Sequence, residues 1–193
     1  MNSNQLAEYV HNLFASYLES QMSLADYLPE KISLAAEKIV ECLLQDGKVI
    51  VCGNGASAVN AQHFTTALIN QYVVERPALP AICLAQDLNI EAAQIFSRQI
   101  HALGSERDLL IILTTSGDAS CLIQAVDAAK ERGMDVLTLS GKTGGILSNH
   151  LGPDDLEILV KLEHQARIRE THLFILHCLC DLIDQSLFGA MSG

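Results

Sequence analysis

The chain has 193 residues, of which 49% are hydrophobic and 18% charged, and its formal net charge is −11. This length and apolar content fit one domain with a sizeable core. Twelve basic residues against 23 acidic ones, with no basic run, argue against direct binding to nucleic acid, which requires clustered positive charge. No apolar stretch is long enough to cross a bilayer, and residues 1–5 lack the basic start of a signal peptide, so we expect a cytoplasmic protein.

The first 46 residues predict two helices. Apolar residues recur at helical spacing over residues 6–18, and a second helical run follows Pro29, over residues 31–45. From residue 47 onward, short apolar strands alternate with helices. The expected strands cover residues 48–52, 79–84, 109–113, 135–139 and 155–160, and the expected helices cover 57–71, 120–132 and 167–187.

Strands that are apolar throughout and separated by helices are typical of a parallel sheet covered on both faces. We therefore predict an α/β fold with a doubly wound, flavodoxin-like sheet of five parallel strands flanked by helices. Residues 1–193 are expected to form a single domain, with N-terminal helices over 1–46 and the α/β core and closing C-terminal helix over 47–193.

Two polar turns follow strands of this sheet, where ligands of such folds bind. The first is Gly53-Asn54-Gly55-Ala56-Ser57, and it reads either as an anion site at a helix start or as a plain turn with a serine cap. The second is Thr114-Thr115-Ser116-Gly117-Asp118-Ala119-Ser120, whose hydroxyls and backbone amides are typical of a phosphate cradle. The alternative is a capped turn whose hydroxyls face water. Two such turns at one edge favour an anion site, although Asp118 would oppose a phosphate.

Several motifs together resemble the SIS-domain (sugar isomerase) family, in its phosphoheptose isomerase branch. They are residues 53–57, 61–64, 75–82, 115–117 and 166–172, which span nearly the whole chain. Residues 151–155 and 179–188 are most similar to the family members that associate with the DnaA replication initiator, the DiaA type. The resemblance implies phosphosugar contacts at Asn54, Gly55, Ser57, Asp87, Thr115 and Ser116.

The isomerases of this branch use a glutamate and a histidine for proton transfer, and a zinc site of two histidines, a glutamate and a glutamine. The matching positions here are His63, Ala67, Arg169 and His177. Alanine has no lone pair to accept a proton, and arginine places a fixed positive charge where a cation would bind. We therefore expect no catalytic residue, no metal and no other cofactor, with His63 and His177 as vestigial ligands that pack in the core or at a subunit boundary.

The six cysteines lie mostly in apolar runs and form no CxxC pair, which favours reduced thiols over disulfides or a zinc site. By resemblance, the leading hypothesis is a non-catalytic homotetramer that binds DnaA and promotes its assembly at the chromosomal origin. Leu187 and Phe188 are the candidate docking residues, and the alternative is that Phe188 packs on its own subunit. The alternative functions are an isomerase of sedoheptulose 7-phosphate and a phosphosugar-binding sensor.

Overall fold

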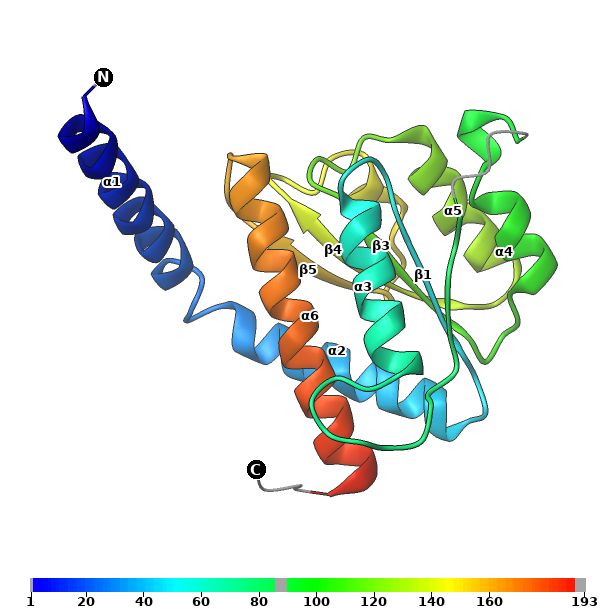
Figure 1. Ribbon diagram of the computed structural model, residues 1–193. Helices are drawn as coiled ribbons and strands as arrows, with labels where there is room; N and C mark the ends of the chain where they lie inside the picture. The colour runs from blue at the N-terminus through cyan, green and yellow to red at the C-terminus, as the bar shows by residue number, and fades with distance from the viewer. Residues whose placement is uncertain (1, 86–89, 190–193) are drawn as a thin grey trace.

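The computed structural model describes residues 2–85 and 90–189 of the chain (Figure 1). Its sheet has five parallel strands in the order β2-β1-β3-β4-β5. The strands are β1 (Val49–Gly53), β2 (Ala81–Cys83), β3 (Leu109–Leu113), β4 (Asp135–Gly141) and β5 (Leu156–Val160). The helices are α1 (Ser3–Met22), α2 (Leu28–Leu44), α3 (Ser57–Ile69), α4 (Ser97–Leu103), α5 (Ser120–Glu131) and α6 (Gln165–Phe188), with 3-10 turns η1 (Ala92–Gln94) and η2 (Leu147–His150).

The predicted α/β fold is confirmed, including the five parallel strands and the order typical of flavodoxin-like sheets. Sequence analysis did not predict α4, η1 or η2, because they are too short to show a helical period. From β1 the chain winds to β2 on one side and then returns to β3 on the other side. The winding therefore reverses between β1 and β3, and a crevice for ligands is expected beyond their carboxyl ends.

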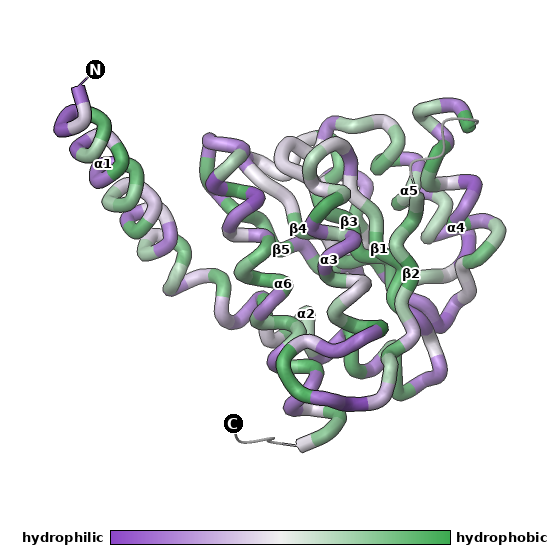
Figure 2. The backbone as a smooth tube through the Cα atoms, viewed as in Figure 1, coloured by the Kyte–Doolittle hydropathy of each residue, from purple (hydrophilic) through white to green (hydrophobic). Residues whose placement is uncertain are grey.

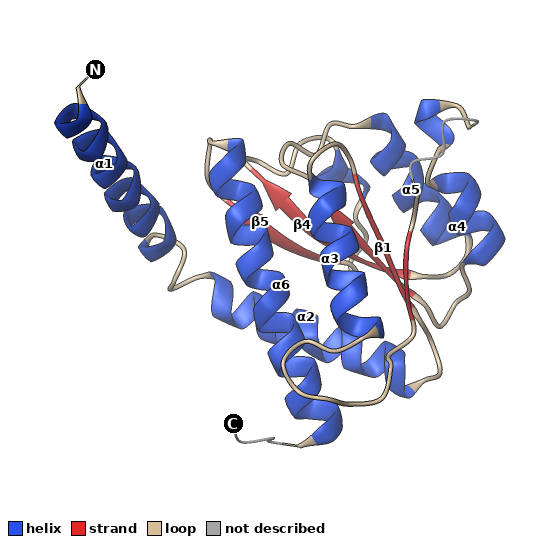
Figure 3. Ribbon diagram, viewed as in Figure 1, coloured by secondary structure: helices blue, strands red, loops and turns tan. Residues whose placement is uncertain are grey.

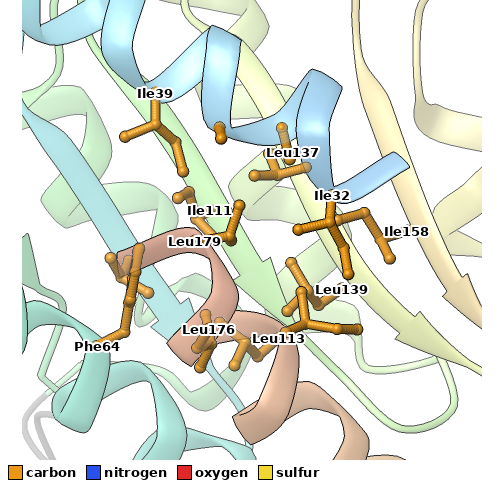
Figure 4. Close-up of a cluster of buried hydrophobic side chains, with 14 of the residues drawn as sticks. Ile32, Ile39, Phe64, Ile111, Leu113, Leu137, Leu139, Ile158, Leu176 and Leu179 are labelled. Carbon is orange, nitrogen blue, oxygen red and sulfur yellow. The ribbon is translucent and has the colours of Figure 1, made fainter. Parts of the chain in front are cut away.

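Two apolar clusters, one on each face of the sheet, explain why β1 and β3 carry no polar side chain. In β1, Val49 and Val51 belong to the cluster under α2, α3 and α6, whereas Ile50 and Cys52 belong to the cluster under α4 and α5 (Figure 3). Figure 4 shows the first cluster, in which Ile39 of α2 and Leu179 of α6 meet the apolar side chains of β3 and β4. Because both faces are buried, a strand needs no polar alternation.

Helix α1 projects away from this body and buries none of its residues (Figure 1). Its start is fixed by a capping box in which the side chains of Asn2 and Gln5 each accept a hydrogen bond from the other's backbone N–H. Hydrophobic positions nevertheless recur along it (Figure 2). The side chains of Val10, Leu13 and Phe14 are 46–62% exposed. An exposed apolar stripe of this kind is typical of an interaction surface.

Within the described part of the chain, no helix is both long enough and apolar enough to cross a membrane.

Candidate functional site

Two polar turns lie side by side at the carboxyl edge of the sheet. Gly53, the last residue of β1, pairs with Leu113, the last residue of β3. The glycine turn (residues 53–57) and the hydroxyl turn (residues 114–118) therefore leave adjacent strands at the same level. This is the point where the winding of the sheet reverses, so the predicted position of the crevice and the two predicted turns coincide.

The glycine turn connects β1 to α3 through a tight backbone turn. A Cβ atom on Gly53 would lie 2.9 Å from the carbonyl of Ser57, and Gly55 has a φ of +54°, a conformation that glycine adopts at little cost. The N-cap of α3 is Ala56, which makes no side-chain cap, and Ser57 is buried inside the first turn. Ser57 therefore does not cap the helix. The first N–H groups of α3 donate instead to backbone carbonyls of the turn, Ser57 to Asn54 at 3.1 Å and Ala58 to Gly55 at 3.2 Å, so an anion would be attracted here by the dipole of the helix.

The hydroxyl turn is organised by its own first residue. Thr114 is fully buried, and its Oγ1 accepts a hydrogen bond of 3.1 Å from the backbone N–H of Gly117, which has a φ of +75°. Thr115 and Ser116 remain partly exposed above it. The N-cap of α5, Ala119, likewise makes no side-chain cap, and its carbonyl accepts hydrogen bonds from the N–H groups of Leu122 and Ile123. This turn therefore also ends at a helix start, whose dipole favours an anion.

Asp118 is exposed beside the hydroxyl turn and contacts the loop that follows β4. Its Oδ1 accepts a hydrogen bond of 3.2 Å from the backbone N–H of Ile146, in the loop that follows β4. The carboxylate therefore faces that loop and braces it. Asp87, the remaining predicted phosphosugar contact, lies outside the described residues.

Two histidines from distant parts of the sequence meet on the outer side of α3 and α6. The Nε2 atoms of His63 and His177 are 3.0 Å apart, and the ring of Tyr72 lies 5.4 Å from that of His177. At this separation one nitrogen carries a proton and the other accepts it. The pKa of His177 is lowered from 6.5 by burial first and by the neighbouring His63 second, while Asp181 opposes the shift. His177 is therefore a neutral imidazole at pH 7, the form that accepts a proton.

The positions expected to carry a glutamate and a glutamine contribute no side-chain ligand to this pair. Ala67 lies one helical turn beyond His63 and is buried. Arg169 precedes His177 by eight residues, a rise of about 12 Å along α6. Its backbone carbonyl accepts a hydrogen bond from the amide of Asn60 at 3.0 Å. The two imidazoles are thus brought together without a side chain from either of these positions.

The residues present do not form a complete metal site. Among the described residues, no group of three or more His, Cys, Asp or Glu side chains could hold a metal ion. The two imidazoles provide half of the four ligands that a structural zinc ion requires. No metal-dependent step is therefore derived for this site.

Leu187 and Phe188, the candidate docking residues, are partly buried and pack against the main apolar cluster of their own chain. This arrangement agrees with the alternative that Phe188 packs on its own subunit. Sequence reasoning did not identify Tyr72 or the loop at residues 141–148 as parts of the site. The adjacent glycines at 144 and 145 were the available signal for that loop, because such pairs mark tight turns.

Comparisons with known proteins agree on the family. The family model described as "SIS domain" matches residues 12–141. A protein of Shewanella loihica named phosphoheptose isomerase is 42% identical over 95% of this chain and 97% of its own length. The solved structure of a phosphoheptose isomerase from Francisella tularensis is 44% identical, with a TM-score of 0.88 over 96% of this chain and all of that chain. That of Neisseria gonorrhoeae is 35% identical, with a TM-score of 0.85 over 93% and 99%.

These findings contradict the hypothesis of a non-catalytic regulator of DnaA, because the full-length relatives are named as enzymes. The expectation that the chain is not an enzyme was wrong for a physical reason. It took the carboxylate missing at Ala67 as the loss of the base, although a carboxylate is not the only group that can accept a proton. The particular closeness to the DnaA-associating members is not supported by the comparisons. The chain belongs to the SIS-domain family, in its phosphoheptose isomerase branch.

Proposed function

We propose that this protein is a phosphosugar isomerase that interconverts a seven-carbon ketose phosphate, sedoheptulose 7-phosphate, and the corresponding aldose phosphate. The observation that carries the proposal is the 42–43% identity, over 95% of the chain, to proteins named phosphoheptose isomerase. The paired turns at the carboxyl edge of β1 and β3 support it, since they offer an anion site. The His63–His177 pair supports it further, since it offers proton transfer.

The phosphate would bind between the two turns. We assign its contacts to the backbone and side chains of Asn54, Gly55, Ser57, Thr115 and Ser116, with Asp87 as a further proposed contact of the sugar. Helices α3 and α5 both start at the carboxyl edge, where their dipoles favour negative charge. Attraction by helix dipoles also fits a chain of net charge −11, which brings few cations to the site.

The imidazole pair would move the proton. Aldose–ketose isomerisation removes a proton from the carbon next to the carbonyl, gives an enediol, and returns the proton to the neighbouring carbon while the hydroxyl proton shifts between the two oxygens. Neutral His177 accepts the carbon-bound proton, and His63 is the partner that shares it. His63 lies six residues after Ser57, a rise of about 9 Å along α3, comparable with the length of an extended seven-carbon sugar phosphate.

We also propose that the protein acts as a homotetramer. Phe174 is 54% exposed on α6 and lies three residues before His177, so it shares a helix face with the imidazole pair. A second subunit that covers Phe174 and the apolar stripe of α1 would also shield the histidines from water. Exclusion of water strengthens the interactions that stabilise an enediolate.

The whole chain would act as one SIS domain, because α2 packs on the sheet through Ile32 and Ile39 and so belongs to the same core. A cytoplasmic location, which the composition predicts, is supported by the six thiols, since disulfides are rare in that compartment.

Turnover of sedoheptulose 7-phosphate by the purified full-length protein tests the proposal directly. His63→Asn and His177→Asn are each expected to lower kcat by at least about 100-fold, because a positioned acid or base contributes roughly 10²–10⁴-fold. His101→Asn is the matched control. His101 is an exposed histidine that contacts Glu131 on the opposite face of the sheet, at 2.8 Å, so its replacement should leave turnover unchanged.

Circular dichroism establishes that each variant is folded. The proposal fails if wild-type protein converts no phosphosugar between pH 6 and 9, with or without added zinc. It also fails if both histidine variants retain wild-type turnover. Binding without turnover in a thermal-shift assay would equally contradict an isomerase.

A further inference from the structure

The loop after β4 is packed directly against the hydroxyl turn. This bracing loop (residues 141–148) donates a hydrogen bond of 2.9 Å from the N–H of Leu147 to the carbonyl of Gly117. The two backbones approach so closely that neither Gly117 nor Gly145 has room for a side chain. A Cβ atom on Gly117 would lie 1.8 Å from the carbonyl oxygen of Gly144, and one on Gly145 would lie 2.2 Å from that of Ser116. A displacement of the bracing loop must therefore displace the hydroxyl turn.

One carboxylate holds the bracing loop from below. Oε1 of Glu157 accepts two short hydrogen bonds, 2.6 Å from Oγ of Ser140 and 2.7 Å from Oγ of Ser148. Ser140 belongs to β4, before the bracing loop, and Ser148 belongs to η2, at its end. A Cβ atom on Gly144 would lie 2.7 Å from the same carboxylate oxygen. Glu157 therefore ties together the two ends of the loop beneath its tightest point.

Glu157 is unusual in its strand. β5 reads Leu-Glu-Ile-Leu-Val, so Glu157 is the only charged residue of an otherwise apolar element. Hydrogen bonds to an ionised acceptor are shorter and stronger than those between neutral groups. A carboxylate here therefore makes the loop stiffer than an apolar residue could, because an apolar side chain would leave both hydroxyls without their acceptor.

We propose that Glu157 is a positioning residue for anion binding. Through Ser140, Ser148 and the bracing loop, it fixes the backbone of Ser116 and Gly117 in the conformation that receives the phosphate. The inference rests on the proposed function, in which the hydroxyl turn binds the phosphate of the substrate. Glu157 touches neither the phosphate nor the reacting carbons, and its effect falls on substrate affinity.

The test compares Glu157→Ala with Glu157→Gln and Ser148→Ala. Glu157→Ala is expected to raise both the Kd, measured by calorimetry, and the KM for sedoheptulose 7-phosphate about tenfold, with kcat changed less than threefold. This corresponds to about 1.4 kcal/mol of binding energy. Glu157→Gln keeps an acceptor oxygen and should restore most of the affinity. Ser148→Ala removes one of the two hydrogen bonds, and its effect should be smaller.

Asp108→Asn is the matched control for the loss of a carboxylate that accepts hydrogen bonds. Asp108 is buried at the opposite edge of the sheet, where it accepts hydrogen bonds from Ser105 Oγ at 2.9 Å and from Lys48 Nζ at 2.6 Å. This variant should lower the stability without changing Kd or KM. If it raises Kd as much as Glu157→Ala does, the effect of Glu157 is merely structural and the proposal is overturned.

Amide hydrogen exchange tests the same connection without a ligand. In Glu157→Ala the amides of Gly117 and Leu147 should exchange at least about tenfold faster than in wild type, while the amides of β3 keep their protection. If wild-type protein binds no phosphosugar, the proposed function fails, whereas the exchange result still decides whether Glu157 fixes the turn. Unchanged exchange at both amides, or wild-type Kd in Glu157→Ala, refutes the positioning role.

Discussion

Replacing His172 by glutamine should remove much of the acid sensitivity of this protein. His172 lies on α6 and is completely buried. Its Nε2 atom lies 3.1 Å from the carbonyl oxygen of Ser140, so this nitrogen carries the proton of the neutral ring. Nδ1 has no hydrogen-bond partner among the described residues. A second proton would therefore place a charge in the core with nothing to receive it.

The magnitude follows from the pKa of His172. Burial lowers this pKa from 6.5 to about 4, and the hydrogen bond to the carbonyl of Ser140 opposes only part of the shift. Between pH 6.5 and 4 the unfolded chain binds a proton that the folded chain does not, so the free energy of unfolding falls as the pH falls. The loss is about 1.4 kcal/mol per pH unit and reaches about 3 kcal/mol near pH 4.

Urea denaturation at pH 7.5, 6.5, 5.5 and 4.5 measures this contribution, with protein concentration fixed because subunit association also affects stability. His172→Gln keeps a donor for the carbonyl of Ser140 and cannot titrate. The free energy of unfolding of wild type should therefore fall about 2–3 kcal/mol more than that of the variant between pH 6.5 and 4.5. Parallel curves for the two proteins across this range would refute the assignment of a neutral, buried His172.

Arg76→Ala should lower the free energy of unfolding by about 3–5 kcal/mol in urea denaturation. The side chain of Arg76 is 3% exposed, and its removal leaves the carboxylate of Asp184 and two carbonyl oxygens of α3 without their hydrogen-bond donor. An effect below 1 kcal/mol would contradict the buried ion pair. Gly117→Ala should destabilise by several kcal/mol, since its Cβ would meet the facing backbone, whereas Gly55→Ala should cost only about 1–2 kcal/mol, since its Cβ meets nothing within 4 Å. Equal thermal shifts for the two variants would contradict the tight contact at Gly117. Phe14→Glu should shift the protein toward smaller species in sedimentation velocity, and an unchanged distribution would exclude α1 from the subunit contact.

The sheet and its two turns could be predicted because their signals are local. β1 and β3 are apolar at every position, and each runs into a glycine-bearing turn and a helix. That pattern specifies a parallel strand with both faces buried, and the carboxyl ends of such strands share one edge. The helix over residues 97–103 was missed because seven residues give too few turns to establish a period.

The functional reading from sequence went wrong where it depended on one missing side chain. Ala67 is buried, as is common for alanine. The absence of a carboxylate at this position does not show which other side chains lie on the surface of α3 and α6. His63 and His177 are 114 residues apart in the chain and meet only because α3 and α6 pack side by side. The charge of Asp118 was likewise visible in the sequence, but its direction toward Ile146 was not.

The sequence by itself determined the order of helices and strands, the parallel sheet and the position of the two turns. Each of these follows from the periodicity and backbone preferences of a few consecutive residues. Only the tertiary structure decided that two imidazoles share a surface, that Phe188 packs against its own core, and that Glu157 supports a turn 40 residues earlier in the chain. The reason is that side-chain contacts between distant segments depend on how helices and strands pack, and a pattern of consecutive residues does not specify that packing.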